Sequence, residues 1–287
     1  MNPSPELFSR IEKLVGSKPV AWKAINKGYT QAERYVMQFE NGTSTFVKLA
    51  TEKDTVKWLR DEHKAYSVIK ADFMPKMIAW EYGEYPILVL EDLSKGHWPP
   101  PWTSGQIQKV FDTLKKLAEI KIEGDFDSLS NFKKELTGWQ KISQDPKGFL
   151  GLGLVSPEWL EKTLPTLIKA ESEIKLEGDS LVHTDIRSDN ICFVGDKTIF
   201  IDWNWTVKGN PMFDVVAWLP SLYAEGGPTP WSFNINEPEL IVALAGFHAF
   251  SACQPANFKG AEAIRALQLK FLKVYIPWVM KTLDLPN

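Results

Sequence analysis

The sequence has few of the features that mark secreted, metal-thiolate or membrane proteins. Its 287 residues include only two cysteines, Cys192 and Cys253, whose spacing fits neither a disulfide framework nor a CxxC motif. No apolar run approaches the roughly 18 residues that a transmembrane helix needs, and the N-terminal stretch lacks the apolar core of a signal peptide. We therefore expect a cytoplasmic protein with two buried free thiols and no membrane partner.

Neither positive nor negative charge is in large excess in the sequence. Lysine and arginine number 33 and aspartate and glutamate 36, for a net charge of −3. Such a balance gives no reason to expect nucleic acid as a partner. Apolar residues make up 44% of the chain, which is enough for a sizeable core. We expect one large domain or two small ones, in a monomer or homodimer.

One stretch, residues 181–205, combines short apolar runs with polar side chains. The runs Leu181-Val182 and 198–201 flank a polar loop, and we predict that each forms a short buried strand. Two strands linked in this way would bring their ends together at the mouth of a cleft. They would gather three side chains around one point: Asp185, Asn190 and Asp202.

The oxygen atoms of these side chains indicate the kind of ion that they would bind. Carboxylate and amide oxygens without histidine or cysteine clusters suit Mg²⁺ rather than zinc. Mg²⁺ held by one or two protein oxygens and several phosphate oxygens is typical of phosphoryl transfer. The alternative is a hairpin with a polar turn and a surface aspartate.

The spacing of these residues resembles that of a known family. His183-x-Asp185-x-x-x-x-Asn190, followed by Ile-Asp-Trp at 201–203, is similar to the catalytic loop and metal-binding aspartate of protein-kinase-like phosphotransferases. It resembles the aminoglycoside phosphotransferase and choline kinase family most. The resemblance implies an α+β, two-lobe fold: an N-terminal nucleotide-binding lobe with a small antiparallel sheet and a helix (1–92), and a larger, mainly helical catalytic and substrate-binding lobe (93–287).

Periodicity along the chain predicts the same order of elements. Asn41-Gly42 between two alternating runs is a hairpin signal, and the Pro-rich segment after Leu93 marks a change of architecture. Predicted strands are 20–26, 34–39, 44–49, 76–82 and 86–90. Predicted helices are 5–15, 52–70, 104–120, about 132–142, 156–174, an apolar helix that opens at Asp214, 237–253 and 259–282.

Lys48 stands in a predicted strand among apolar residues. Alternation places it on one face with Phe46 and Ala50, and a lysine there is either paired or extended to solvent. The resemblance implies that Lys48 pairs with Glu62 of the following helix and holds the α- and β-phosphates of a nucleotide. The alternative is a solvated lysine and a surface glutamate.

The resemblance implies that two further segments bind the nucleotide. The connection that contains Gly28 and Thr30 lies where the family covers the phosphates, although the sequence has no GxGxxG motif and an ordinary turn is the alternative. Backbone groups of Glu91, Asp92 and Leu93 correspond to the hinge that bonds the purine edge. Side chains do not determine that contact, so the choice between ATP and GTP stays open.

The resemblance also implies roles in the chemistry. Asp185 is the catalytic base, Arg187 is a catalytic residue near the γ-phosphate, and Asn190 and Asp202 hold Mg²⁺. His183 and Asp214 support the catalytic loop, although Asp214 alone also suits a helix N-cap. Asp189, a departure from the family pattern, would pair with Arg187 or face solvent.

These expectations define a Mg²⁺-dependent small-molecule kinase that phosphorylates a hydroxyl of a metabolite or antibiotic with ATP or GTP. Residues 215–287 hold five acids and five bases, so a polycationic acceptor is not favoured. Trp203, Trp205, Trp218 and Trp231 favour a less charged, hydroxylated acceptor, although most such tryptophans lie in cores. The alternatives are a nucleotide-binding pseudokinase and a metal-dependent phosphohydrolase.

Overall fold

The chain forms two compact units, which we describe separately. The structure, a computed structural model, describes residues 3–26, 28, 30–121 and 124–286. Unit 1 consists of Met1–Pro99 and Asp189–Thr206, and unit 2 of Pro100–Ser188 and Val207–Asn287. Unit 1 thus includes residues 189–206, whereas the lobes predicted from the sequence, 1–92 and 93–287, place these residues in the second lobe. That division into functional lobes stays a prediction.

Unit 1 is built on a five-stranded antiparallel sheet. Its strands are β1 (Pro19–Ala24), β2 (Glu33–Phe39), β3 (Ser44–Leu49), β4 (Met77–Glu81) and β5 (Ile87–Glu91). Their order in the sheet is β1-β2-β3-β5-β4, and every neighbouring pair is antiparallel. The predicted antiparallel strands are therefore present. The β2–β3 hairpin closes at Asn41-Gly42, as the sequence predicted.

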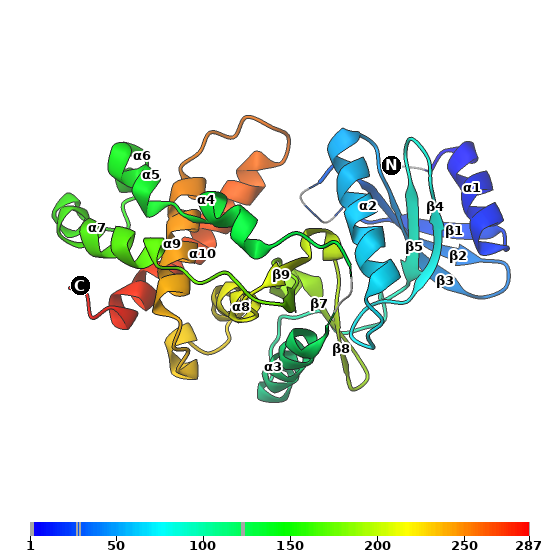
Figure 1. The fold of residues 1–287 in the computed structure, drawn as a ribbon. Coiled ribbons are helices and arrows are strands. Elements are labelled where there is room, and N and C mark those ends of the chain that lie inside the picture. Colours follow the sequence, from blue (N-terminus) through cyan, green and yellow to red (C-terminus); the bar gives the residue numbers. More distant parts are fainter. Residues whose placement is uncertain (1–2, 27, 29, 122–123, 287) are drawn as a thin grey trace. The chain divides into compact units, whose positions relative to one another are not determined.

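Helices cover the two faces of this sheet (Figure 1). Helix α1 (Pro5–Val15) starts after the Ser4 hydroxyl cap and buries Leu7 and Ile11 against one face, where Met37 and Val47 lie. Helix α2 (Lys53–Val68) lies on the opposite face. Because strand side chains alternate between faces, Lys48 points toward α2 while Val47 points into the core.

A second hairpin completes unit 1 and corrects one prediction. Strand β7 (Ile191–Val194) pairs with β8 (Lys197–Phe200) through a tight turn at Gly195 and Asp196. The apolar run at Leu181-Val182 pairs instead with residues 207–209, as β6 (Ser180–Val182) and β9 (Val207–Gly209) in unit 2. The two runs predicted as linked strands thus belong to different sheets, because the short turn lets residues 197–200 pair with the chain just before them.

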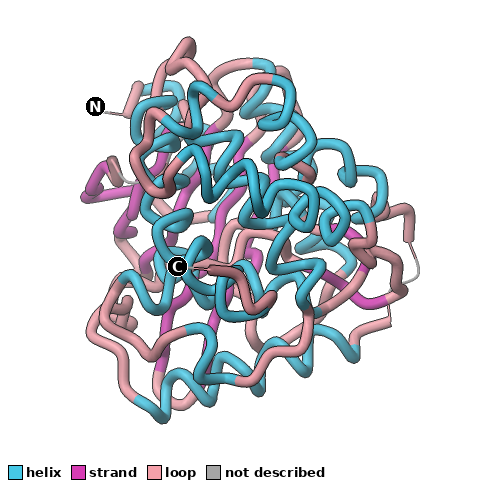
Figure 2. The backbone as a smooth tube through the Cα atoms, turned by 90° about the vertical axis from the view of Figure 1, so that its left-hand side faces the viewer, coloured by secondary structure: helices cyan, strands magenta, loops and turns pink. Residues whose placement is uncertain are grey.

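Unit 2 is mainly helical (Figure 2). Its longer helices are α3 (Ser104–Glu119), α7 (Pro157–Ser172), α8 (Met212–Ala224), α9 (Pro238–Ala252) and α10 (Ala261–Thr282). Its shorter elements are η1 (Leu129–Phe132), α4 (Lys133–Leu136), α5 (Trp139–Gln144), α6 (Lys147–Leu150) and η4 (Pro230–Phe233). In the described part of the chain, no helix combines the length and apolar character required to cross a membrane.

The helix predicted over residues 132–142 is interrupted at Gly138. A Cβ there would come within 1.9 Å of the Gly246 carbonyl oxygen on α9, so only glycine permits this approach. The buried Glu171 carboxylate accepts hydrogen bonds from the N–H groups of residues 138, 139 and 140. These bonds satisfy the first donors of a new helix, α5, instead of continuing the preceding one.

Candidate active site

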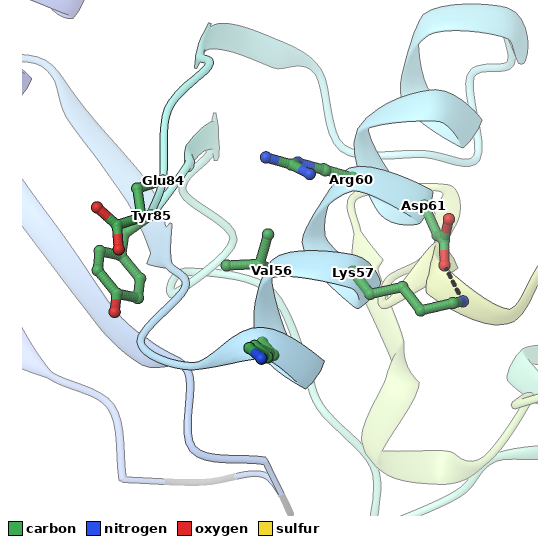
Figure 3. A pocket seen from close by; sticks show the side chains of 7 residues that line it. Val56, Lys57, Arg60, Asp61, Glu84 and Tyr85 are labelled. Atoms are coloured by element: carbon green, nitrogen blue, oxygen red, sulfur yellow. Dashed lines mark hydrogen bonds and ion pairs between the residues drawn. The ribbon is translucent and has the colours of Figure 1, made fainter.

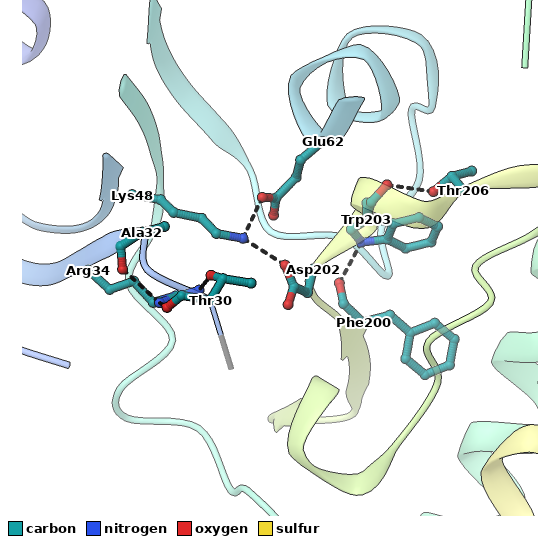
Figure 4. A network of polar contacts seen from close by, with 9 residues as sticks. All are labelled: Thr30, Ala32, Arg34, Lys48, Glu62, Phe200, Asp202, Trp203 and Thr206. Carbon is teal, nitrogen blue, oxygen red and sulfur yellow. Dashed lines mark hydrogen bonds and ion pairs between the residues drawn. The ribbon is translucent and has the colours of Figure 1, made fainter. Parts of the chain in front are cut away.

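Three charged side chains meet in unit 1 (Figure 4). The Lys48 Nζ donates to Glu62 Oε2 and to Asp202 Oδ1, each at 2.6 Å. Glu62 comes from α2 and Asp202 follows β8, so three separate segments supply the cluster. Lys48 and Glu62 are the pair that the sequence predicted, and the structure adds Asp202 as a second partner of the lysine.

Aromatic packing fixes the two segments that carry the carboxylates. After β8 the chain forms the short helix η3 (Trp203–Trp205), and the fully buried Trp203 donates its indole N–H to the Phe200 carbonyl at 2.8 Å. Trp205 lies against Trp58 of α2, with ring centroids 6.0 Å apart. These contacts hold the end of β8 beside α2, and hence Asp202 beside Glu62.

The backbone at Asp202 is unusual. Its φ of 67° lies in the left-handed region, which residues other than glycine rarely adopt. Such conformations persist only where the surrounding structure enforces them, and they concentrate at functional sites. Here the ion pair with Lys48 and the turn into η3 fix the carboxylate.

Burial and charge act together on Lys48, which is 8% exposed. Burial alone lowers the pKa of its ammonium group, but the carboxylates of Asp202 and Glu62 raise it more, so the net shift is upward. Lys48 therefore stays charged. With one cation and two anions, these three side chains carry one excess negative charge in a largely buried place.

Asn190 lies next to this cluster. Its backbone carbonyl accepts a hydrogen bond from the N–H of Ile201 at 3.1 Å, which places residue 190 beside the residue that precedes Asp202. The Asn190 side chain is buried, at 4% exposure. An amide oxygen, a carboxylate and an excess negative charge suit a hard divalent cation such as Mg²⁺.

The part of the chain that the structure describes offers no larger cluster of metal ligands. Among residues 3–26, 28, 30–121 and 124–286, no three histidine, cysteine, aspartate or glutamate side chains gather as metal ligands. The sequence predicts only two protein ligands for Mg²⁺, Asn190 and Asp202. This number fits an ion that takes its remaining ligands from phosphate and water.

The predicted catalytic loop follows β6 in unit 2 and is held by Asp214. The Asp214 carboxylate accepts hydrogen bonds from the backbone N–H groups of His183 and Thr184, both at 2.7 Å. Thr184 has a φ of 68°, a strained conformation for a β-branched residue. The Asp185 N–H donates to His183 Nδ1 at 3.3 Å. Asp214 and His183 thus shape the segment that carries Asp185.

Asp214 is 1% exposed, and its pKa is raised to about 7, mainly by burial. The two backbone hydrogen bonds lower this pKa, whereas the negative charge of Asp185 raises it further. Asp214 lies in the first turn of α8, which begins at Met212 after Pro211. The alternative interpretation of Asp214 as a helix N-cap is therefore wrong, because Pro211 occupies that position.

Asp185 and Arg187 form an ion pair, with Arg187 Nε 3.1 Å from Asp185 Oδ1. Their side chains are 29% and 13% exposed, respectively. Asp189 is exposed. The predicted base thus lies next to a guanidinium in this loop.

The segment predicted to cover the phosphates folds against an arginine that the sequence analysis did not single out. The Arg34 guanidinium donates to the Ala32 carbonyl at 2.8 Å, to the Thr30 carbonyl at 3.4 Å and to the Thr30 hydroxyl. Gly28, with a φ of 107°, packs against the same guanidinium. Residues 27 and 29 lie outside the described residues.

The predicted hinge is held by internal hydrogen bonds. The Leu93 carbonyl accepts from the Gly96 N–H at 2.9 Å and from the Trp98 indole at 3.2 Å. The Asp92 carboxylate accepts from the Ser44 hydroxyl and the Ser94 N–H; although burial raises the pKa of Asp92, these bonds lower it more. Glu91 ends β5 and pairs with Thr45. Contact of this segment with a base stays a prediction.

The four tryptophans considered for acceptor binding differ in exposure. Trp203 and Trp218 are fully buried, so they serve the core. Trp231 is half-buried and has the Lys281 ammonium 5.4 Å from its ring centroid. Trp205 is 43% exposed. It is therefore the tryptophan of this set with the most surface to offer a ligand.

A hollow of about 510 Å³ on unit 1 lies between α2 and the turn that joins β4 to β5 (Figure 3). Its lining consists of Lys53, Val56, Lys57, Arg60, Asp61, Glu84 and Tyr85. Lys57 is neutralised by Asp61 at 2.7 Å. None of the predicted nucleotide-binding or catalytic residues lines this hollow, and we assign no part of the nucleotide to it.

Comparison with known proteins identifies the class of protein. Residues 21–232 match the model of a family described as the phosphotransferase enzyme family. This match covers more than half of the sequence, and the chain belongs to that family. The resemblance inferred from the catalytic loop is confirmed, and so is the prediction of a phosphotransferase. No match was found among curated proteins.

Solved structures of similar fold share little sequence with this chain. A spectinomycin phosphotransferase in complex with ADP and spectinomycin is 14% identical, covers 99% of both chains and has a TM-score of 0.56. An amicoumacin kinase in complex with AMP-PNP, Ca²⁺ and Ami is 12% identical, the match covers 95% of this chain and 93% of that chain, and the TM-score is 0.55. A choline/ethanolamine kinase family protein from Mesorhizobium loti is 11% identical, the match covers 92% of both chains, and the TM-score is 0.53. The predicted α+β, kinase-like fold is confirmed.

Proposed function

We propose that the protein transfers the γ-phosphoryl group of ATP or GTP to a hydroxyl of a small metabolite or antibiotic. The observation that carries this proposal is the buried Lys48 ammonium bonded to both Glu62 and Asp202. Phosphoryl transfer requires mainly positioning and charge compensation. A fixed cation beside a carboxylate that suits a metal ion supplies both.

In this proposal unit 1 holds the nucleotide. Lys48 binds the α- and β-phosphates, and Glu62 keeps its ammonium in place. Gly28 and Thr30 cover the phosphates, and backbone groups of Glu91–Leu93 bond the base. Asn190 and Asp202 would hold Mg²⁺, which when bound neutralises charge on the phosphate oxygens.

Asp185 is the proposed base. It accepts or orients the proton of the acceptor hydroxyl, and Arg187 offers a planar fork of donors to phosphate oxygens. The hydrogen bonds that the backbone N–H groups of residues 183 and 184 donate to Asp214 support the assignment, because a base must be held in a fixed position to act. His183 completes the support of this loop.

The proposed acceptor is a hydroxylated small molecule with little positive charge. Structurally similar enzymes are named for spectinomycin, amicoumacin and macrolides. Residues 215–287 of this chain have no excess of acids to attract a polycation. The exposed Trp205 suits the flat or apolar face of a ring.

Incubation with Mg-ATP or Mg-GTP and a panel of hydroxylated metabolites and antibiotics tests the proposal. We expect an acceptor whose mass increases by one phosphoryl group, with ADP or GDP formed in equal amount. Nucleotide binding without any turnover would indicate a pseudokinase instead. Release of inorganic phosphate from phosphate esters without a nucleotide would indicate a phosphohydrolase.

A further inference from the structure

Arg34 and Lys48 stand directly opposite each other in the sheet of unit 1. The register of the antiparallel β2–β3 pair joins Arg34 to Lys48, with Tyr35 opposite Val47. Tyr35 and Val47 lie in the core on the α1 face. Because alternate side chains share a face, Arg34 and Lys48 both project from the opposite face.

Two like charges at directly opposed positions destabilise a strand pair. Lys48 has two carboxylate partners. Arg34 is half-buried, and no ion pair within the described residues gives it a carboxylate. Its recorded bonds go to neutral acceptors, the carbonyls of Thr30 and Ala32 and the Thr30 hydroxyl. Among the described residues, no carboxylate bonds to the guanidinium, whose charge acts only at longer range on Glu62 and lowers the pKa of that group.

The two cations also affect each other electrostatically. Burial lowers the pKa of Lys48, and the two carboxylates raise it. The charge of Arg34 is a smaller effect and lowers this pKa. A cation without a bonded carboxylate, directly opposite another cation, is a local cost. Sequences usually retain such a cost where a site needs it for function.

The two described residues of the segment proposed to cover the phosphates, Gly28 and Thr30, lie against Arg34. A Cβ built at Gly28 would lie 3.2 Å from Arg34 Cζ, so the glycine backbone rests on the guanidinium. Thr30, two residues further on, is bonded to it (Figure 4). The two loop residues assigned to phosphate binding therefore both contact Arg34.

We propose that Arg34 is a second phosphate-binding cation, which receives the β- and γ-phosphates of the nucleotide beside Lys48. This inference rests on the proposed function and adds to it a residue outside the family motifs. A guanidinium presents a planar fork of donors that matches phosphate oxygens, and bonds between charged groups are roughly twice as strong as neutral ones. Bound phosphates would thus replace the neutral loop acceptors with charged ones.

The charges agree with this assignment. Arg34 and Lys48 balance Glu62 and Asp202, so these four side chains together are neutral. A divalent cation at Asp202 then leaves two positive charges for the phosphates. Without Arg34 the same site would offer only one.

The test compares nucleotides that differ in phosphate number, with wild type, Arg34→Gln and Arg34→Lys. Affinities for the triphosphate, diphosphate and monophosphate of the preferred purine are measured by titration calorimetry in Mg²⁺ buffer. We expect Arg34→Gln to weaken triphosphate binding by about 10- to 100-fold, the range for hydrogen bonds between charged groups. Monophosphate affinity should stay within about twofold of wild type, and Arg34→Lys should fall in between.

Lys18→Gln is the matched control, because Lys18 is an exposed cation of the same unit. It should leave all three affinities unchanged, which excludes a general effect of net charge. The melting temperature of each variant without nucleotide checks that the fold persists. If Arg34→Gln fails to fold, the comparison of triphosphate with monophosphate is made on Arg34→Lys.

Three results would overturn the assignment. Equal losses for monophosphate and triphosphate would make Arg34 a structural support of the loop. Unchanged triphosphate affinity in Arg34→Gln would remove any role in binding. A wild-type protein that binds no purine nucleotide would refute the proposed function itself, whereas the first two results leave that function standing.

Discussion

Lys48 and Glu62 form an ion pair of 2.6 Å in which the two side chains are only 10% and 2% exposed. A buried pair of this kind differs from a surface salt bridge in what its loss does. Removal of one partner leaves a charge without compensation inside the protein, which typically costs about 3–5 kcal/mol. Replacement of both partners by apolar residues removes this fully buried charge, and only the Asp202 carboxylate, whose side chain is 32% exposed, then lacks its lysine.

The first prediction is that Lys48→Met lowers the free energy of unfolding by about 3 kcal/mol or more, because Glu62 is left unpaired. The double variant with Glu62→Leu should recover most of that loss while nucleotide binding stays weak. Urea unfolding of the four proteins of the cycle measures this coupling. The half-exposed pair Arg10–Glu81 is the control, and its cycle should show a coupling of only about 1 kcal/mol or less. Additive effects at Lys48 and Glu62 would contradict the prediction.

The second prediction concerns Asp202, which supplies the negative charge of the proposed Mg²⁺ site. In Asp202→Asn the nucleotide should bind no more tightly with Mg²⁺ than without it, because an amide is a much weaker ligand for this ion than a carboxylate. Titration of ATP or GTP with Mg²⁺ and with EDTA measures the difference. Asp196→Asn, on the exposed turn of the β7–β8 hairpin, should keep the wild-type dependence on Mg²⁺. Mg²⁺-enhanced binding in the Asp202 variant would refute the assignment.

The third prediction concerns His248, which lies among the aromatic rings of Phe247, Phe271 and Tyr275. Burial lowers its pKa to about 3, so the folded protein keeps the imidazole neutral while the unfolded chain protonates it below about 6.5. The stabilisation is present above pH 6.5 and is lost as the pH falls through the acid range, by roughly 1.4 kcal/mol per pH unit.

His248→Phe preserves the ring packing and removes this titration. We expect wild type and variant to respond alike between pH 7 and 8, and the variant to lose less stability between pH 6.5 and 4. Urea unfolding at a series of pH values measures both curves. Parallel curves across the acid range would show that His248 is solvated rather than buried as a neutral side chain.

Much of unit 1 follows from the sequence because its signals are local. The predicted bounds of α1 and β3 agree with the structure, since a serine cap, a helical period and strict alternation all act over a few residues. Strand pairing over a longer range was less predictable. The apolar character of Leu181-Val182 predicts a buried strand but not its partner. The turn at Gly195-Asp196 pairs residues 197–200 with residues 191–194, and Leu181-Val182 pairs with residues 207–209 instead.

Arg34 shows why one residue of the candidate site was missed. Asn41-Gly42 correctly predicted a hairpin, and a two-residue loop there would have paired Lys48 with Tyr35. The loop instead includes Glu40, because the Phe39 N–H bonds to the Thr43 carbonyl and Gly42 adopts a φ of 79°. One additional loop residue shifts the register and places a cation opposite Lys48.

The chemical role of a residue is harder to predict from the sequence than its place in a helix or strand. The motif around Asp185 predicted a family, and the family match confirms it. The support of this loop by Asp214 depends on a contact between residues about thirty positions apart. The strained backbone at Thr184 and Asp202 is likewise visible only in the folded chain.

Asp185→Asn tests the central claim most directly, because asparagine keeps the size of the side chain but accepts no proton. Turnover of the acceptor found in the panel should fall by about 10²–10⁴-fold, the usual contribution of a general base. The affinity for Mg-nucleotide, measured on the same preparation, should remain, since Lys48, Asn190 and Asp202 are unchanged. Asp196→Asn, on the exposed turn of the β7–β8 hairpin, is again the control and should retain full turnover. Turnover of Asp185→Asn within about threefold of wild type would contradict the role of Asp185 as base, and with it most of the proposed mechanism.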